Sequence, residues 1–202
     1  IIVISSAIKK NNLELIEAKK KQLPVYKRGE MLAHIVSLTK NIVVVGLRLS
    51  EFEWTSEFIE IHKALLPLDF RENAYVYNRA KWHFYKKEYE EVMRLLMEVA
   101  YQDVFYQLDT KSMLLKTYYE LEEIDALESL LASFKIYLRR NKKVSAHHRS
   151  NYLNLIRFTE KLLKVVPKDK ERVAQIRQQL KASPKIADLN WLLEKLKELK
   201  KG

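Results

Sequence analysis

The sequence predicts an all-α protein, an α-solenoid of stacked antiparallel helical hairpins with a C-terminal capping helix. Apolar residues recur three and four positions apart along most of the 202 residues, which is the spacing of one helix face. A repeat accompanies this pattern, because Phe52, Tyr89 and Ile124 each open a second helix, 37 and 35 residues apart. Repeats of this length are typical of helical arrays, in which neighbouring hairpins bury each other's apolar faces.

Three hairpins are expected between residues 31 and 140. The expected helix pairs are 31–49 with 52–66, 74–86 with 89–99, and 108–121 with a helix that opens at residue 124. Within the first helix, Ile42 to Val45 is a β-branched run that in isolation resembles a buried strand. We expect helix there, and no sheet, because the run lies inside a longer helical pattern and no second strand is evident to pair with it.

The N-terminal residues are expected to form an incomplete hairpin. Leu15 to Pro24 parallels Phe58 to Pro67, which suggests a partial earlier copy of the repeat. The opening Ile1 to Ile4 is too short for a membrane span and lacks the flanks of a signal peptide. We interpret this opening as a truncated edge, and the chain as a fragment of a longer polypeptide.

The C-terminal residues are expected to close the array. Helices are predicted over 147–166 and 171–182, after which Ser183 would cap a last helix with Pro184 in its first turn. An apolar stripe along that helix would cover the open end of the array; it comprises Ile186, Leu189, Leu192, Leu193, Leu196 and Leu199. We therefore expect hairpins over 1–140, closing helices over 141–202, and one continuous domain.

Composition excludes several classes of protein. With 48% apolar and 31% charged residues, the chain is expected to be folded, without a membrane partner, and located in the cytoplasm. Only 3 Gly are present, too few for a glycine-rich phosphate loop, and Cys is absent. The five His residues show no metal-binding spacing. No cofactor, metal or catalytic residue is therefore expected, and we do not expect an enzyme.

Residues 31–140 resemble the tetratricopeptide repeat family. The segment Tyr77 to Val92 is similar to the two-helix signature of that family, with Ala80 at its small-residue position, and Leu114 to Leu121 resembles the next copy. Departures occur in both helices, because Thr55, Val92 and Leu127 replace a small residue of the second helix and Gly46 and His83 replace a Tyr of the first. The block from Trp54 to Arg140 also resembles uncharacterised bacterial proteins with such repeats.

The resemblance implies a peptide-binding groove along the first helices of the hairpins. In this family an Asn of the first helix, just before the conserved apolar and small pair, commonly binds the backbone of an extended peptide. An amide side chain suits that role because it both donates and accepts hydrogen bonds. Lysines and an arginine would add a positive lining that favours acidic ligands. The groove residues implied are Lys40, Asn41, Val44, Arg48, Tyr77, Asn78, Lys81, Tyr85, Lys116 and Tyr119. The alternative is that they are ordinary surface residues.

A basic segment lies in the second half of the chain. The formal net charge is +11, and no acidic residue occurs between Glu128 and Glu160. The cations that we expect to form an anion or nucleic-acid patch are Lys135, Arg139, Arg140, Lys142, Lys143 and Arg149. Such a patch would serve a nucleic acid or an acidic protein surface equally well.

Two functions follow from these features. The first is a non-catalytic protein-interaction module, a scaffold that binds a peptide or a partner subunit through its concave face. The alternative is a nucleic-acid-binding helical repeat that uses residues 135–157. The clustered aromatic residues, among them Trp82, are expected to pack in the core. The alternative is a stacking platform for nucleic acid bases, for which Tyr85, flanked by Lys81 and Lys86, is the candidate. The sequence does not predict the oligomeric state.

Overall fold

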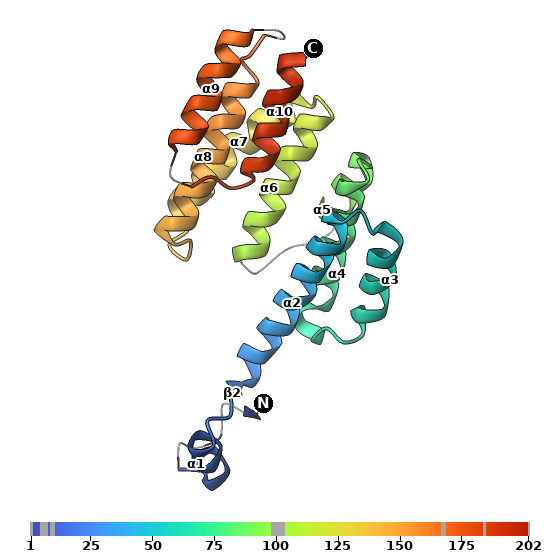
Figure 1. Cartoon of the computed structure of the whole chain (residues 1–202), viewed down its shortest axis with the longest axis vertical. Coiled ribbons are helices and arrows are strands. Elements are labelled where there is room, and N and C mark those ends of the chain that lie inside the picture. Colours follow the sequence, from blue (N-terminus) through green and yellow to red (C-terminus); the bar gives the residue numbers. More distant parts are fainter. Residues whose placement is uncertain are drawn as a thin grey trace. The chain divides into compact units, whose positions relative to one another are not determined.

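The computed structural model describes residues 2–4, 8, 11–97, 104–166, 169–183 and 185–201. The chain divides into two compact units, residues 1–100 and 101–202, which are shown in Figure 1. Over the described ranges the secondary structure consists of ten helices and one two-stranded sheet. The division falls near residue 100 rather than at the expected boundary of 140. The hairpin over 104–140 therefore packs with the C-terminal helices that follow it.

The first unit begins with a strand–helix–strand motif. Strand β1 (Ile2–Ile4) pairs in parallel with β2 (Val25–Lys27), and helix α1 (Leu13–Lys20) connects them. The expectations of no sheet and of an incomplete hairpin are therefore wrong. The two strands are three residues each and their partners lie 23 positions apart, from Ile2 to Val25, so no local pattern marks the pairing. The register places Ile4 beside Lys27, which brings the carboxyl ends of both strands to one edge.

Helix α1 has a side-chain cap at its N-terminus and one buried side. The Asn12 side chain accepts a hydrogen bond from the backbone N–H of Leu15 at 3.0 Å, which satisfies one of the donors left open in the first turn. Leu15 and Ala18 are buried, whereas Leu13 is exposed. The helix ends at Lys20, and Gln22 then adopts a positive φ of 53° in the turn toward β2.

From residue 28 to residue 97 the first unit consists of two helical hairpins. Helix α2 (Arg28–Arg48) turns into α3 (Phe52–Lys63), and α4 (Leu68–Tyr85) turns into α5 (Tyr89–Met97). Helix α2 contains Ile42 to Val45, so the helical interpretation of that run is confirmed. Each hairpin reverses direction at a residue with positive φ, Ser50 in the first and Lys87 in the second.

Apolar residues of α2 and α3 form the core of this unit. Val43, Leu47 and Ile59 are almost fully buried, and Trp82 and Tyr85 of α4 are among the aromatic side chains that pack against them. The Trp82 indole Nε1 donates to the Phe52 carbonyl oxygen at 2.8 Å, which satisfies the polar end of a partly buried ring. Trp82 and Tyr85 are thus packing residues, as the core interpretation of the aromatic cluster expects.

The described residues of the second unit form five helices. They are α6 (Val104–Glu120), α7 (Ile124–Arg140), α8 (Ala146–Leu162), α9 (Lys170–Ala182) and α10 (Leu189–Lys201). The expected start of the last helix is wrong, because Ser183 follows the C-terminus of α9 and α10 begins at Leu189. Pro184 lies outside the described residues. The arrangement of all the hairpins as one continuous solenoid stays a prediction, because the hairpins fall into two units.

One apolar core runs through the second unit. Phe134 of α7, Phe158 of α8 and Leu192 of α10 are each fully buried, and α10 packs against both α8 and α9. Leu192 and Leu196 point inward as predicted, whereas Leu189 is 38% exposed. The position of α10 over this core is consistent with a capping role, which stays a prediction.

Polar contacts hold α10 against α6 at two places. Glu120 accepts from Trp191 Nε1 at 2.8 Å and from Lys195 Nζ at 2.7 Å. Asp188, just before α10, accepts from Ser112 Oγ at 2.5 Å and from Lys116 Nζ at 2.8 Å. Burial alone would lower the pKa of Lys195, but its hydrogen bonds to Glu120 and Glu198 and the negative charges of these two residues together outweigh burial and raise it. These pairs fix the register of α10 on α6.

A search of the described helices for a membrane span finds none that is both long and apolar enough.

Candidate functional site

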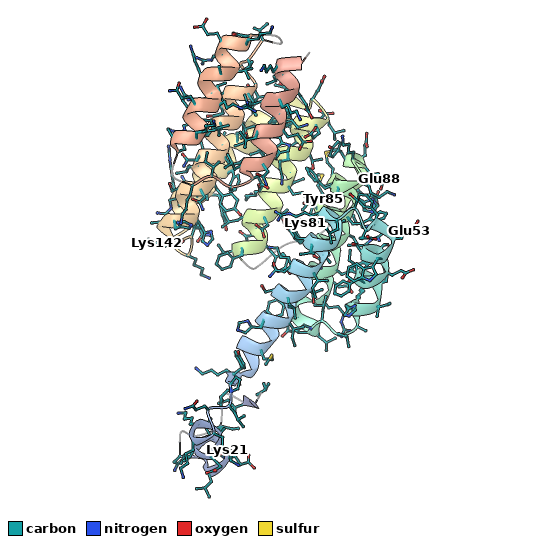
Figure 2. All side chains as sticks on the ribbon, viewed as in Figure 1. Lys21, Glu53, Lys81, Tyr85, Glu88 and Lys142 are labelled. Atoms are coloured by element: carbon teal, nitrogen blue, oxygen red, sulfur yellow. The ribbon has the colours of Figure 1, made fainter. Side chains whose placement is uncertain are left out.

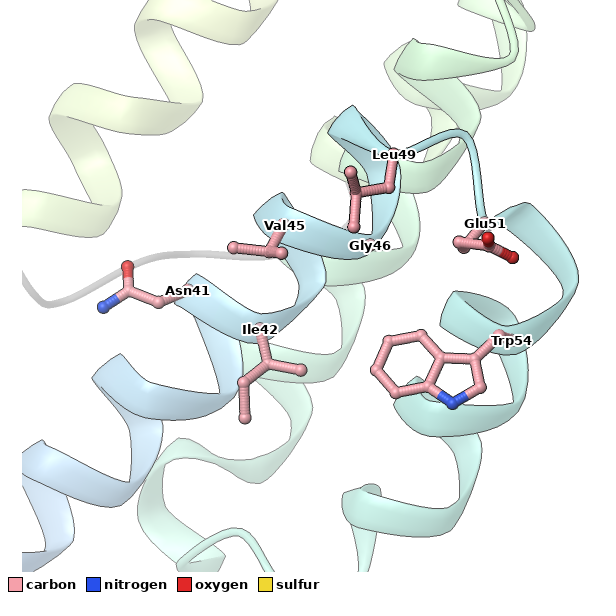
Figure 3. Close-up of a pocket in the computed structure, with 7 residues that line it drawn as sticks. All are labelled: Asn41, Ile42, Val45, Gly46, Leu49, Glu51 and Trp54. Carbon is pink, nitrogen blue, oxygen red and sulfur yellow. The ribbon is translucent and has the colours of Figure 1, made fainter.

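An open apolar cavity lies between α2 and α3 and is drawn in Figure 3. Its volume is about 510 Å³, and four of its wall residues come from the last three turns of α2. The residues that line it are Asn41, Ile42, Val45, Gly46, Leu49, Glu51 and Trp54. Figure 3 shows the Trp54 ring on α3 facing the α2 side chains. Glu51 is the single ionisable side chain among these seven, so the cavity suits an apolar group.

Gly46 lets α2 and α3 approach closely beside the cavity. A Cβ atom at this position would overlap the Thr55 hydroxyl and would lie 3.1 Å from the Trp54 ring. The Thr55 side chain is fully buried and donates to the Glu51 carbonyl oxygen at 2.5 Å, so it has little freedom to move away. The glycine is therefore required by the helix contact, and its backbone forms part of the cavity wall.

Aromatic side chains extend the apolar wall along α3. The rings of Trp54 and Phe58 stack with centroids 5.3 Å apart, and those of Phe58 and His62 stack at 3.9 Å. His62 Nδ1 lies 2.9 Å from the Phe58 carbonyl oxygen, which fixes the ring orientation. These three residues follow the four-residue spacing of one helix face. The ladder supplies contact surface, and within it no pair of groups is placed for acid–base chemistry.

Residues of the expected peptide groove lie partly together in the first unit. Lys40 of α2 and Lys81 of α4 place their ammonium groups 5.1 and 5.4 Å from the centre of the Tyr77 ring. Lys81 also donates to the Tyr77 hydroxyl at 3.4 Å, and Figure 2 shows Lys81 and Tyr85 along the same helix. Asn41 is exposed and lines the cavity.

Two of the expected groove residues are buried. Tyr77 is 2% exposed and Asn78 is 3% exposed, because α4 packs against α2, α3 and α5. The Asn78 side-chain oxygen has no hydrogen-bond partner among the described atoms. The expectation that Asn78 faces an open groove and binds a peptide backbone is therefore wrong.

The remaining groove residues have separate surroundings. Val44 is half-buried and Arg48 is exposed, both on α2. Lys116 and Tyr119 belong to the second unit, where Lys116 pairs with Asp188. Tyr119 lies edge-on to Trp191, with ring centroids 5.2 Å apart. In the second unit these two side chains hold α10 rather than line a groove.

Only part of the expected basic patch is free of structural contacts. Lys135 pairs with Glu160 at 2.5 Å, and the Arg149 guanidinium donates to three backbone carbonyls at the end of α7 and in the following loop. These two cations therefore support the fold. The exposed members are Arg139, Arg140, Lys142 and Lys143. Figure 2 shows Lys142 in the loop between α7 and α8.

Metal-binding clusters are absent from the described part of the chain, where no three His, Cys, Asp or Glu residues lie close enough to hold an ion.

Comparison with known proteins places the informative similarity at the N-terminus. Residues 1–40 match the model of the Mur ligase family, catalytic domain. A stretch of 46 residues is 85% identical to UDP-N-acetylmuramate–L-alanine ligase of Pelagibacter ubique, and the corresponding enzymes of Cereibacter sphaeroides and Paracoccus denitrificans are 54% and 50% identical. Each match covers 23% of this chain and 10% of the relative. No solved structure matches.

These matches correct the expected identity and function. The tetratricopeptide resemblance is wrong as an identification, because the family model that matches is that of the Mur ligases. The interaction module, its nucleic-acid alternative and the expectation of no enzyme are wrong as well, because the matching relatives are ligases by name. Helical periodicity missed this similarity, because it lies in a short strand–helix–strand motif without a spaced chemical motif.

Proposed function

We propose that this chain acts in the joining of UDP-N-acetylmuramate to L-alanine, and that its N-terminal strand–helix–strand motif serves that reaction. The observation that carries the proposal is the 85% identity over 46 residues to a ligase named for these two substrates. The family match over residues 1–40 includes β1, α1 and β2. The remaining residues of the chain carry helices to which this proposal assigns no catalytic part.

The parallel strands suggest where the nucleotide substrate would bind. In open α/β sheets, ligands bind outside the carboxyl ends of the strands. Here β1 ends at Ile4 and β2 ends at Lys27, and the register places these two ends side by side. The diphosphate of UDP-N-acetylmuramate is anionic, and Lys27 supplies a cation at this edge. The formal net charge of +11 also favours an anionic ligand.

Substrate binding is a better assignment for these residues than phosphoryl chemistry. Joining a carboxylate to an amine requires activation of the carboxylate. The three glycines, Gly29, Gly46 and Gly202, do not form a G-x-x-x-x-G-K-[ST] phosphate loop. We therefore assign recognition of UDP-N-acetylmuramate to the motif. A cytoplasmic location is part of the proposal and agrees with the absence of cysteine from the sequence.

Calorimetric titration of the whole chain with UDP-N-acetylmuramate tests this proposal. Saturable binding is expected, and Lys27→Ala should weaken it about tenfold, the effect of losing one charge-assisted contact. Lys21→Ala is the matched control, because Lys21 lies between α1 and β2 in the sequence, whereas Lys27 is the last residue of β2. Absence of binding at millimolar substrate would overturn the proposal. Equal weakening of substrate binding by Lys27→Ala and Lys21→Ala would contradict a binding site at the carboxyl ends of the strands.

A further inference from the structure

Helix α2 carries a second apolar face besides the one that packs inside its unit. The inner face includes Val36, Val43 and Leu47, all buried. The outer face, which we call the α2 stripe, follows the spacing three, four, three, four over fifteen residues. It consists of Ile35, Leu38, Ile42, Val45 and Leu49. This alternation is the heptad repeat of a coiled coil, in which apolar residues occupy the first and fourth positions.

Four of the five stripe residues are exposed, and Ile42 at its centre is half-buried. The exposed fractions are 60% for Leu38, 56% for Val45 and 68% for Leu49, and Trp54 beside them is 49% exposed. Soluble proteins rarely present a contiguous apolar row of this kind unless a partner covers it. The cavity between α2 and α3 opens onto the C-terminal part of the stripe, where it provides a hole for an incoming apolar side chain.

The residue types favour a second copy of the same helix as the partner. In the N-terminal part of the stripe, Ile35 and Ile42 occupy the first heptad position and Leu38 the fourth, which is the combination that favours parallel two-stranded pairing; in the C-terminal part, Val45 at the fourth position and Leu49 at the first keep the seam apolar without following that combination. The flanking positions are His34, Thr39 and Asn41 in the N-terminal part and Gly46 and Arg48 in the C-terminal part, so Arg48 is the one Lys, Arg, Asp or Glu among these five. A seam of this composition is self-complementary, as a two-fold interface requires.

Area and charge indicate that such a dimer is weak. We take the full surface of each of these side chains as about 150–250 Å². The exposed parts of the stripe and of Trp54 then amount to roughly 500 Å² per copy. The area that two copies would bury together lies near the lower limit for a specific interface. Each copy carries a net charge of +11, so two copies repel at low ionic strength. Added salt should therefore strengthen the pairing, whereas it would weaken binding to an acidic partner.

We propose that two copies of this chain associate through the α2 stripe as a short parallel coiled coil. This inference is independent of the proposed function. Sedimentation velocity over about 1 to 200 µM should show a monomer–dimer equilibrium in the micromolar range that shifts toward dimer when salt is raised. Leu38→Glu should raise the dissociation constant at least tenfold. Ser37→Glu, an exposed change of the same charge on the same helix, should leave it unchanged.

Disulfide cross-linking tests whether the two α2 helices pair in parallel, and it does so without a substitution that weakens the interface. Because the protein contains no cysteine, Leu38→Cys introduces a single thiol. In a parallel pair this position meets its own copy, so oxidation should yield a covalent dimer, while Ser37→Cys should yield little. A protein that stays monomeric over the whole concentration range, or equal cross-linking of both variants, would overturn the proposal. So would a dimer that dissociates as salt increases.

Discussion

At the scale of single residues, Gly46 shows how one missing side chain sets a helix contact. A Cβ atom there would overlap the buried Thr55 hydroxyl. The gain in helix propensity from Gly→Ala is about 1 kcal/mol, and overpacking at a closed contact costs about 1–3 kcal/mol. The cost of overpacking against Thr55 therefore exceeds the gain in helix propensity unless Thr55 moves, so an alanine at this position is expected to lower stability.

We predict that Gly46→Ala lowers the free energy of unfolding by about 1 kcal/mol, the difference between these two effects. Urea unfolding followed by circular dichroism measures it. In a Thr55→Ala background the overlap with the hydroxyl is gone, so the same Gly46→Ala change should be neutral or stabilising. A destabilisation of equal size in both backgrounds would show that the close contact with Thr55 is not the cause.

Tyr152 links stability to pH in the second unit. Its side chain is buried, and its hydroxyl donates to Asp109 Oδ1 at 3.0 Å. Burial, followed by the charge of Asp109 and its hydrogen bond, raises the pKa of Tyr152 far above its usual value near 10. As the pH rises above about 10, the unfolded chain ionises at this residue and the folded chain does not. Stability contributed by Tyr152 is therefore lost with increasing pH.

We predict a smaller loss of stability above pH ~10 in Tyr152→Phe than in the parent protein. The difference in slope should approach 1.4 kcal/mol per pH unit, the value for one titrating group. At neutral pH the variant should be less stable by about 1 kcal/mol because the hydrogen bond to Asp109 is lost. Denaturant unfolding at a series of pH values between about 8 and 11 gives both quantities. Parallel pH profiles for the two proteins would contradict the assignment.

At the scale of elements, helices were predictable and the short strands were not. Helix α7 opens at Ile124 as expected, and Leu127, Leu131 and Phe134 repeat at helical spacing and all become buried. Ile2–Ile4 and Val25–Lys27 give no such pattern, because a three-residue strand shows barely one alternation of faces. Their pairing depends on a partner on the far side of α1, which local sequence does not indicate.

The prediction at the scale of elements concerns the contribution of α10 to the stability of the second unit. Leu192 is fully buried in the core that α10 shares with α8 and α9, whereas Glu194 two residues later is exposed. Leu192→Ala should cost about 2–5 kcal/mol of stability, since it removes transfer free energy and leaves a cavity. Glu194→Ala should change it by less than about 0.5 kcal/mol. Thermal and urea unfolding compare the two, and similar stabilities would contradict a core role for α10.

At the scale of the whole molecule, the two units differ in what sequence reasoning could recover. In the second unit, spacing alone indicates the helices and most of the core. In the first unit, spacing indicates α2 to α5 but leaves the strand–helix–strand motif and the ligase similarity undetected. Of the expected groove residues, Asn41 lines the apolar cavity, whereas Asn78 is buried, because helical periodicity does not reveal how many neighbours cover α4.

The central claim is that the N-terminal motif serves recognition of UDP-N-acetylmuramate, and exchange of the matched segment tests it most directly. The 46-residue stretch of this chain would replace its counterpart in the Pelagibacter ubique ligase, and formation of the joined product would be measured against both substrates. The chimera should keep its turnover. Within it, Lys27→Ala should raise the KM for UDP-N-acetylmuramate about tenfold without changing that for L-alanine. An inactive but folded chimera, or equal effects on both KM values, would contradict the claim.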